Sequence, residues 1–429
     1  MPTRQIQIGS TKCLFDNLID RHAEAYLAAY PEVKEFSNYD KSGTSNYYIG
    51  MVWTNDNEKP DTQQLKIRGS LSMADNRLLE LDLSIVDSPQ SFFPGQIVAF
   101  KAKPSVKGQL TVVKFLDPMK ISPPLKKINT DAKMKLIIAC GPYMKSDQED
   151  WQLYDKLIES IKTNEATHIV LLGPFVDMDN KRIRAHYDTY WRMVFDKIVD
   201  GLYEHECQIF IVPSNRDVLP CNFSSMYLYP CPELDLKHYL RKGIKPKFNI
   251  KSVSDPAQID LGGLFLDVTS AEVLFNLNQC TAFINKGLVN TFTSLYKHII
   301  THGIYPMYPP SGDLAVDYTQ LGRFIQLDRL GAHIIVLPTK FVTQVSNVEN
   351  RLIVPVQKCC TKKQVVLIEI PKIESSQEEP IDSVVITDYT FRMIDIMTTN
   401  ETRTIVDDEM ALVSSLETKA PQADEDLTT

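Results

Sequence analysis

Residues 135–143 read Lys-Leu-Ile-Ile-Ala-Cys-Gly-Pro-Tyr, a short apolar run that ends abruptly in a glycine-proline turn. The same layout returns at 168–177, His-Ile-Val-Leu-Leu-Gly-Pro-Phe-Val-Asp, and at 208–217, Gln-Ile-Phe-Ile-Val-Pro-Ser-Asn-Arg-Asp. Short continuous apolar runs that stop at glycine or proline are typical of strands buried on both faces. These three stretches therefore predict the core of an α/β domain.

Further strands of the same kind are predicted downstream, with helices between several of them. The predicted strands are 264–268, 332–337 and 364–370, and the predicted helices are about 151–161, 187–202 and 291–302. This alternation indicates a layered α/β domain over 131–390, built around a largely continuous apolar sheet. A strand-like stretch at 382–387 is expected to finish that sheet. Residues 391–429 are assigned to an acidic tail that is expected to be partly disordered.

In the chain before this domain, the hydrophobic residues follow a different pattern. Five short, partly alternating β-rich runs lie at 47–54, 64–69, 78–83, 96–101 and 109–115, with turn signals between them. Five such strands in a short span are typical of a β-barrel of the oligonucleotide/oligosaccharide-binding (OB) kind, which we assign to 45–130. Residues 1–44 hold an amphipathic helix at 11–31 and a lead-in, and we expect the helix to pack on the next domain.

Basic side chains of the predicted barrel leave two interpretations open. Barrels of this kind often bind single strands through a basic groove and stacked aromatics, and Lys66, Arg68, Lys101, Lys103 and Lys107 could supply the charge. The same residues are equally typical of solvent-facing strand positions, and no interleaving of aromatic and basic residues stands out. We therefore expect a packing or protein-interaction module rather than a nucleic-acid-binding barrel.

Composition limits the class of protein. The 429 residues are 43% hydrophobic and 23% charged, and the net charge of −8 argues against nucleic-acid binding by bulk electrostatics. No apolar run approaches the ~18 residues that cross a bilayer, and the first residues carry no secretory signal. The eight cysteines form no C-x-x-C pair. We therefore expect an intracellular protein with reduced thiols and no membrane contact.

The turns after the strands are where an α/β sheet gathers its catalytic groups. Their order resembles that of the calcineurin-like metallophosphoesterases, which carry D-x-H after the first strand, G-D-x-x-D after the second, G-N-H-[DE] after the third and a later G-H-x-H turn. Two divalent ions about 3.5–4 Å apart require several carboxylate and imidazole ligands in one clamp. The resemblance implies a two-metal position at these turns.

Position by position, the metal ligands are missing. The residues at the four motifs are Ala139, Cys140 and Gly141, then Pro174 and Asp177, then Asn215, Arg216 and Asp217, and finally Pro338 and Lys340. Only Asp177, Asn215 and Asp217 keep ligand chemistry, which is too little for two metals, and two residues of the set add positive charge. We expect His302 and His333 to be structural. The sequence therefore predicts no metal, no cofactor and no enzymatic activity.

Longer motifs resemble the B subunits of replicative DNA polymerases, which pair an OB fold with an inactivated phosphoesterase domain. The matching stretches have sequences typical of the alpha-type B subunit. They lie at 93–98, 139–143, 172–177, 212–218, 267–270, 297–300, 305–310 and 313–318. The most specific are Tyr-Pro-Met-Tyr-Pro-Pro at 305–310 and Gly-Pro-Phe-Val-Asp at 173–177. The resemblance covers about residues 45–371. The family usually has a helical N-terminal domain, whereas this chain begins at the helix just ahead of the barrel.

The resemblance implies a non-catalytic scaffold subunit in the nucleus that supports primer synthesis. Its partner would be the C-terminal domain of the catalytic subunit of DNA polymerase alpha, with primase reached through the complex and DNA contacted mainly indirectly. The candidate interface is the set Tyr305, Tyr308, Pro309, Pro310 and Tyr318. A rigid proline-rich loop packed on its own domain is the alternative for this set.

Three other functions remain open at this point. A small subunit of a delta- or epsilon-type polymerase would share the architecture. An autonomous single-strand-binding protein would use the barrel, and an active phosphoesterase would need an altered metal site. The stretches 139–143 and 305–310 resemble the alpha-type B subunits in sequence, which favours the alpha-type subunit over these alternatives.

Overall fold

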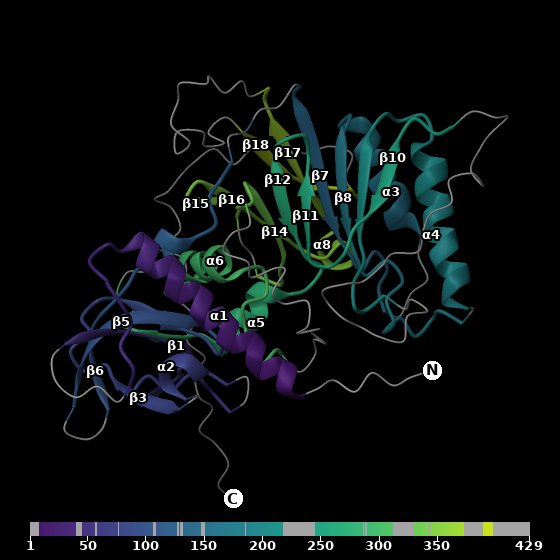
Figure 1. Cartoon of the computed structure of the whole chain (residues 1–429). Coiled ribbons are helices and arrows are strands. Elements are labelled where there is room, and N and C mark those ends of the chain that lie inside the picture. Colours follow the sequence, from purple (N-terminus) through teal and green to yellow (C-terminus); the bar gives the residue numbers. More distant parts are fainter. Residues whose placement is uncertain are drawn as a thin grey trace, which may run out of the picture.

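The computed structural model places a β-barrel beside a layered α/β unit (Figure 1). It describes residues 8–39, 45–55, 58–75, 77–105, 109–126, 128, 132–146, 151–184, 186–217, 245–285, 287, 290–311, 330–341, 344–372 and 389–397. The predicted strand at 382–387, and the tail from 398 onward, lie outside these residues. A mixed α/β architecture with a barrel is confirmed.

Five strands form the barrel. They are β1 (Asn46–Val52), β2 (Leu65–Arg68), β3 (Leu78–Asp82), β5 (Ile97–Pro104) and β6 (Leu110–Phe115), with the short helix α2 (Leu71–Ala74) after β2. The strand order is β1-β2-β3-β6-β5, and β5 pairs again with β1, so the sheet closes on itself. Leu65, Ile67 and Phe100 are among the side chains that fill the interior. All five predicted runs are confirmed as strands.

The α/β unit contains two sheets packed face to face. Their orders are β10-β9-β8-β7-β17-β18 and β11-β12-β14-β16-β15. The bounds are β7 (Met134–Cys140), β8 (His168–Leu172), β9 (Gln208–Val212), β10 (Asn249–Ser252), β11 (Ala257–Asp260), β12 (Phe265–Val268), β14 (Ile334–Pro338), β15 (Ser346–Val348), β16 (Arg351–Val356), β17 (Gln364–Ile370) and β18 (Thr390–Asp395). Side chains from both sheets, such as Ile138 and Val336, share one buried cluster.

The prediction of one largely continuous sheet is therefore wrong. The central strands of both sheets are covered on both faces, so they read as apolar at nearly every position. Alternate residues of β7 show the two environments, because Ile137 faces a helical layer whereas Ile138 faces the second sheet. A local apolar run predicts burial, but it does not distinguish one sheet from two.

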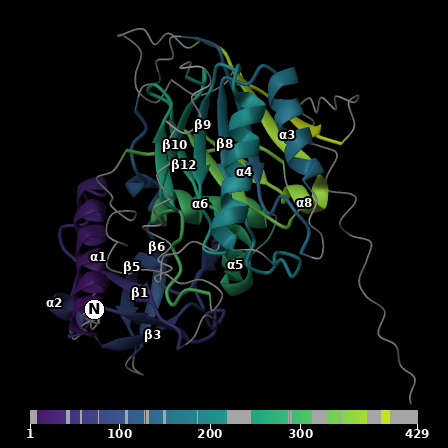
Figure 2. The ribbon, with the colours of Figure 1, turned by 90° about the vertical axis from the view of Figure 1, so that its right-hand side faces the viewer.

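Helices cover the two outer faces of this sandwich. Helices α3 (Gln152–Thr163) and α4 (Tyr187–Leu202) pack on the six-stranded sheet, and Figure 2 shows both in front of it. Helices α5 (Val273–Cys280) and α6 (Thr291–His302) pack on the five-stranded sheet. The one-turn helix α8 (Cys359–Lys362) precedes β17. The predicted helices are confirmed with small shifts of their ends.

Helix α1 (Ile8–Ala29) lies across the junction between the barrel and the α/β unit (Figure 1). Phe15 and Ile19 of α1 share one apolar core with Ile97 of the barrel and Ile299 of α6. The short helix η1 (Pro118–Ile121) also contributes to this core. A two-stranded ribbon of β4 (Gln90–Phe92) and β13 (Ala282–Ile284) adds a second connection. The barrel and the α/β unit are therefore joined by a continuous core.

One predicted boundary needs correction. Strand β18 pairs with β17 over its whole length, so residues 391–395 belong to the six-stranded sheet rather than to the acidic tail. The acidic residues that mark the tail begin further on, and the strand itself has the mixed composition of a partly exposed edge.

Among the helices that the structure describes, none is long and apolar enough to cross a membrane.

Candidate functional site at the strand ends

The three strand-end turns meet because β7, β8 and β9 are parallel neighbours. Cys140, Leu172 and Val212 stand side by side in the register, so the turns that follow them open at the same edge of the sheet. A Cβ added at Gly141 would lie 2.2 Å from the carbonyl oxygen of Pro174. The first two turns are therefore in direct backbone contact where a phosphoesterase would need space for metals.

Asp217 ties the second turn to the third. Its Oδ1 accepts hydrogen bonds from the backbone N–H groups of Phe175 at 2.5 Å and Val176 at 2.8 Å. Its Oδ2 accepts from Ser214 N at 2.9 Å. Burial raises the pKa of Asp217 to about 7, although the three backbone hydrogen bonds act in the opposite direction. The carboxylate faces inward and serves as a structural clamp.

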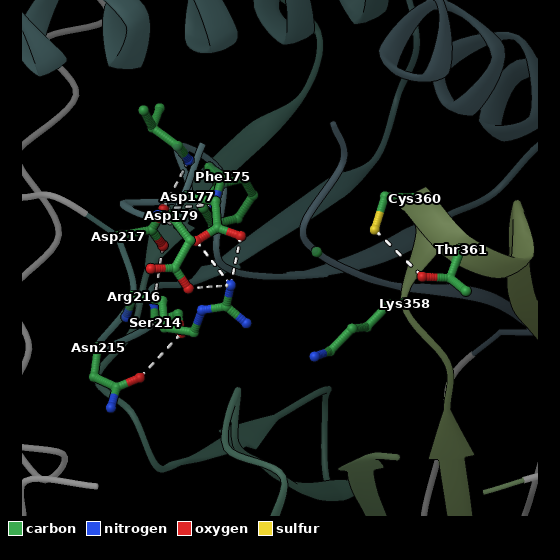
Figure 3. A network of polar contacts seen from close by, with 12 residues as sticks. Phe175, Asp177, Asp179, Ser214, Asn215, Arg216, Asp217, Lys358, Cys360 and Thr361 are labelled. Carbon is green, nitrogen blue, oxygen red and sulfur yellow. Dashed lines mark hydrogen bonds and ion pairs between the residues drawn. The ribbon is translucent and has the colours of Figure 1, made fainter. Parts of the chain in front are cut away.

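Arg216 neutralises the remaining carboxylates. Its Nη2 lies 3.0 and 2.7 Å from the two carboxylate oxygens of Asp177 and 2.9 Å from Oδ2 of Asp179 (Figure 3). The side chain of Asp177 is only 6% exposed, so this carboxylate depends on Arg216 for its compensating charge. A guanidinium thus compensates this carboxylate, and it cannot itself coordinate a cation.

The first turn offers no metal ligand. Ala139 and Cys140 are buried, and the Cys140 thiol lies 3.3 Å from the carbonyl oxygen of Gly141. Burial raises the pKa of the Cys140 thiol, and it raises that of the neighbouring Cys359 to about 12. Metals bind the thiolate, so these protonated thiols are poor ligands.

The remaining predicted positions lie at the end of β14, in the second sheet. Lys340, two residues after Pro338, pairs with Glu272 at 2.9 Å and lies over the ring of Phe275. Lys358 contacts the other carboxylate oxygen of Glu272. Burial acts to raise the pKa of Glu272, but hydrogen bonds from the two lysines outweigh it and lower the pKa. An ion-pair cluster thus follows the end of β14, where the sequence comparison expects the G-H-x-H turn of a phosphoesterase.

The donors present do not fit a metal pair. Within the described part of the chain, no three His, Cys, Asp or Glu side chains are placed to hold an ion. Asn215 lies at the surface of the third turn, where its Oδ1 is 3.4 Å from Ser214 Oγ. Figure 3 shows Arg216 and the aspartates on one side of the site and Lys358 on the other. Cations therefore stand on both sides of the site.

The two histidines that the sequence suggested as structural have partners of their own. His333 lies between Phe265 N at 2.9 Å and Lys126 O at 2.8 Å. His302 contacts the carbonyl oxygen of Ile97 at 3.2 Å, in the junction core far along the chain from the strand-end turns. Neither imidazole points to a metal position.

The proline-rich loop packs on its own chain. Tyr305 is 2% exposed, and its hydroxyl accepts a hydrogen bond from Ser311 N at 3.0 Å. The ring of Tyr308 lies 4.0 Å from that of Phe15, and its N–H donates to Pro94 O at 2.9 Å. The half-buried residues Tyr308, Pro309 and Pro310 keep accessible surface, whereas Tyr318 lies outside the described residues.

Sequence reasoning missed three residues of this site, namely Asp179, Glu272 and Lys358. Asp179 had a weak signal, because it follows Asp177 by two residues and an arginine stands in the neighbouring motif. Glu272 and Lys358 had none, since their meeting depends on how the second sheet is placed against the first.

These features define a class of protein: a barrel fused to a two-sheet α/β unit whose strand-end site is filled by its own side chains. The family described as the DNA polymerase alpha/epsilon B subunit matches residues 136–344. The B subunit of DNA polymerase alpha from Mus musculus is 25% identical over 287 residues, covering 65% of this chain and 46% of the relative. The Drosophila melanogaster B subunit is 26% identical over 266 residues, with 61% and 41% covered.

The B subunit of Saccharomyces cerevisiae DNA polymerase alpha is 27% identical over 267 residues, covering 55% of this chain and 36% of the relative. The chain thus matches about half or less of the length of these relatives. Their similarity confirms the resemblance to the B subunits of replicative polymerases. A solved structure described as a novel archaeal phosphodiesterase aligns with 61% of this chain and 99% of its own, at 14% identity and a TM-score of 0.28. That score is too low to assign a fold.

Proposed function

We propose that this chain is a non-catalytic accessory subunit of a DNA polymerase alpha–primase complex. The observation that carries the proposal is the similarity to the B subunits of DNA polymerase alpha from mouse, fly and yeast. The strand-end site supports the non-catalytic part, since Arg216 holds the carboxylate of Asp177. Such a subunit works in the nucleus and acts through its surfaces.

The finer fold assignment belongs to the same proposal. The barrel order, with β3 parallel to β6 and the other pairs antiparallel, supports an OB fold over about 45–130. Two packed sheets with helices on both outer faces support a calcineurin-like phosphoesterase fold, which extends from 131 through the end of β18.

The proposed partner is the C-terminal domain of the catalytic polymerase subunit. The accessible parts of Tyr308, Pro309 and Pro310 are the proposed contact, because they lie where the barrel, α1 and the α/β unit meet. Tyr305 supports this loop from within the core. Primase and DNA would be reached mainly through the complex, and no cofactor enters the role.

Co-expression of the full chain with the C-terminal domain of a polymerase alpha catalytic subunit tests the proposal. We expect a stable complex that survives gel filtration. Pro310→Ser and Pro309→Ser should weaken it, whereas Leu71→Ser, at an exposed position of the barrel, should not. Failure of the wild-type chains to co-purify would contradict the subunit role. A complex that tolerates the loop variants would remove only the proposed contact.

A further inference from the structure

Cations on the barrel fall into two groups, which the sequence did not distinguish. Arg68 is buried, pairs with Asp16 of α1 and lies over the ring of Trp53. Lys66 pairs with Glu80 on the neighbouring strand at 3.8 Å. These two charges on β2 are therefore compensated by the chain itself, and the β2–β3 surface offers little free positive charge.

Lys101, Lys103 and Lys114 form a second group, called here the lysine patch. Lys101 of β5 stands directly opposite Lys114 of β6 in the strand register, and Lys103 lies two residues from Lys101 on the same face. Among the described residues, no carboxylate forms an ion pair with any of the three. The nearest carboxylate in register, Asp82, is engaged by the hydroxyl of Thr111 at 3.0 Å.

A β-bulge produces this arrangement. The register between β5 and β6 shifts between Lys101 and Ala102, so that Val113 is the extra residue of β6. Both Val113 and Lys114 are consequently exposed, although successive strand residues normally alternate. The bulge thus turns Lys114 outward and places it opposite Lys101. Like charges directly opposite one another destabilise a sheet, so the fold carries a cost that an anionic ligand would relieve.

The neighbouring strand adds an aromatic ring but no stacking platform. Tyr47 of β1 is the register partner of Lys101, whose ammonium lies 5.4 Å from the centre of the Tyr47 ring. This cation–π contact holds Lys101 in place and covers the ring. The patch therefore presents ordered positive charge without a free aromatic face, which suits phosphate groups better than bases.

We infer that the lysine patch binds the phosphate backbone of nucleic acid directly and without sequence preference. A protein partner fits less well, because protein interfaces are depleted in lysine and need an apolar centre, whereas Val113 is the only large apolar side chain exposed among the described residues of these strands. The surface lies on β1, β5 and β6, apart from the compensated cations of β2. The inference concerns a contact of this chain itself and does not depend on the proposed subunit role.

The test is fluorescence anisotropy of the full chain with a 20-nucleotide oligo-dT and with a duplex of equal length, between 50 and 200 mM salt. With three phosphate contacts, the logarithm of the binding constant should fall with the logarithm of the salt concentration. The expected slope is about −2 for the single strand and about −2.7 for the duplex. The triple variant K101E/K103E/K114E should lower affinity at least about tenfold at 50 mM salt and abolish most of the slope.

A matched control reverses the same number of positive charges elsewhere. K156E/K197E/K247E alters three lysines of the α/β unit that are each paired with a carboxylate, and it should bind like the wild type. Lys114→Thr alone relieves the like-charge pair, so it should weaken binding while the melting temperature stays equal or rises. Equal loss in the control triple would show bulk electrostatics and overturn the inference.

Two other results would also overturn the inference. One is the absence of wild-type binding to either oligonucleotide at 50 mM salt. The other is unchanged oligonucleotide binding in K101E/K103E/K114E together with loss of the polymerase partner, which would assign the patch to a protein.

Discussion

Arg216 Nη2 lies 2.7 Å from Oδ2 and 3.0 Å from Oδ1 of Asp177, a carboxylate whose side chain is 6% exposed. The pair bridges two strand-end turns, since Asp177 follows β8 and Arg216 follows β9. The backbone reinforces the bridge, because Met178 N donates to Arg216 O at 2.9 Å. A charge pair within one chain thus compensates this buried carboxylate.

Loss of the arginine should destabilise the fold. Arg216→Ala leaves Asp177 buried without its cation, which we expect to cost about 1–3 kcal/mol of unfolding free energy. The estimate is below that for a fully buried pair because the Arg216 side chain is 35% exposed. Urea denaturation measures the change. The double variant R216A/D177N should recover part of it, because no unpaired charge remains.

The matched control is Arg77→Ala in the barrel, whose ion pair with Asp75 is well exposed. It should change stability by about 0.5 kcal/mol or less. Equal effects of R216A and R77A would show that the Arg216–Asp177 pair contributes nothing special.

The second and third strand-end turns are closely packed, which leads to a second prediction. A Cβ at Gly173 would lie 2.3 Å from Oδ2 of Asp217 and 2.7 Å from Ser214 N. Gly173→Ala must therefore move the second turn away from the third, and we expect a cost of at least about 2 kcal/mol in denaturant unfolding. Gly201→Ala is the comparison: its Cβ would lie 2.8 Å from Cδ1 and Cγ2 of Ile158, so that side chain must shift but no backbone atom must, and alanine favours the helix. A G173A variant as stable as G201A would refute the packed site.

Three buried histidines predict an acid-sensitive junction. Burial lowers the pKa of His22 and His298 to about 3 and that of His302 to about 4, from 6.5 in the unfolded chain. Since the folded pKa values are depressed, unfolding takes up protons below about pH 6.5. The stability that these three histidines contribute is therefore fully present above pH 6.5 and falls toward pH 4, by up to about 1.4 kcal/mol per pH unit for each histidine. Asp217, whose pKa burial raises to about 7, acts in the opposite direction over this range.

Unfolding free energies measured from pH 7.5 to 4.5 check this dependence. His298→Gln removes one of the three groups, whose Nε2 lies 2.7 Å from Ser91 Oγ across the junction, and should reduce the slope. His186→Gln, at an exposed position outside the junction, is the matched control. A wild-type slope equal to that of H298Q would contradict the assignment.

The sequence predicted individual strands well and their assembly less well. The runs 135–140, 168–172 and 208–212 were found because apolar side chains and terminal turns are local signals. Strand β16 was missed. Pro355, its penultimate residue, argues against a strand, although it stands opposite Leu337 in the sheet. The division into two sheets depends on contacts between distant segments, which local patterns do not contain.

The same limit applied to the site. The residues at 139–141, Pro174 and Arg216 could be compared with the phosphoesterase motifs position by position, because each follows a recognisable strand. The partners of the replacing charges were not readable: Lys340 meets Glu272, which lies 68 positions earlier in the chain. The lysine patch was equally hidden, since a bulge in β6 decides that Lys114 faces outward.

Metal content tests most directly the proposal that the strand-end site binds no metal pair. Elemental analysis of the purified full chain, after incubation with Mn²⁺, Fe²⁺ or Zn²⁺ and desalting, measures bound ions per chain. We predict far less than one ion per chain and a melting temperature that EDTA does not change, because Arg216 and Asp217 hold the strand-end turns without an ion. Retention of one or two ions per chain, with a fall in melting temperature on chelation, would contradict the proposal.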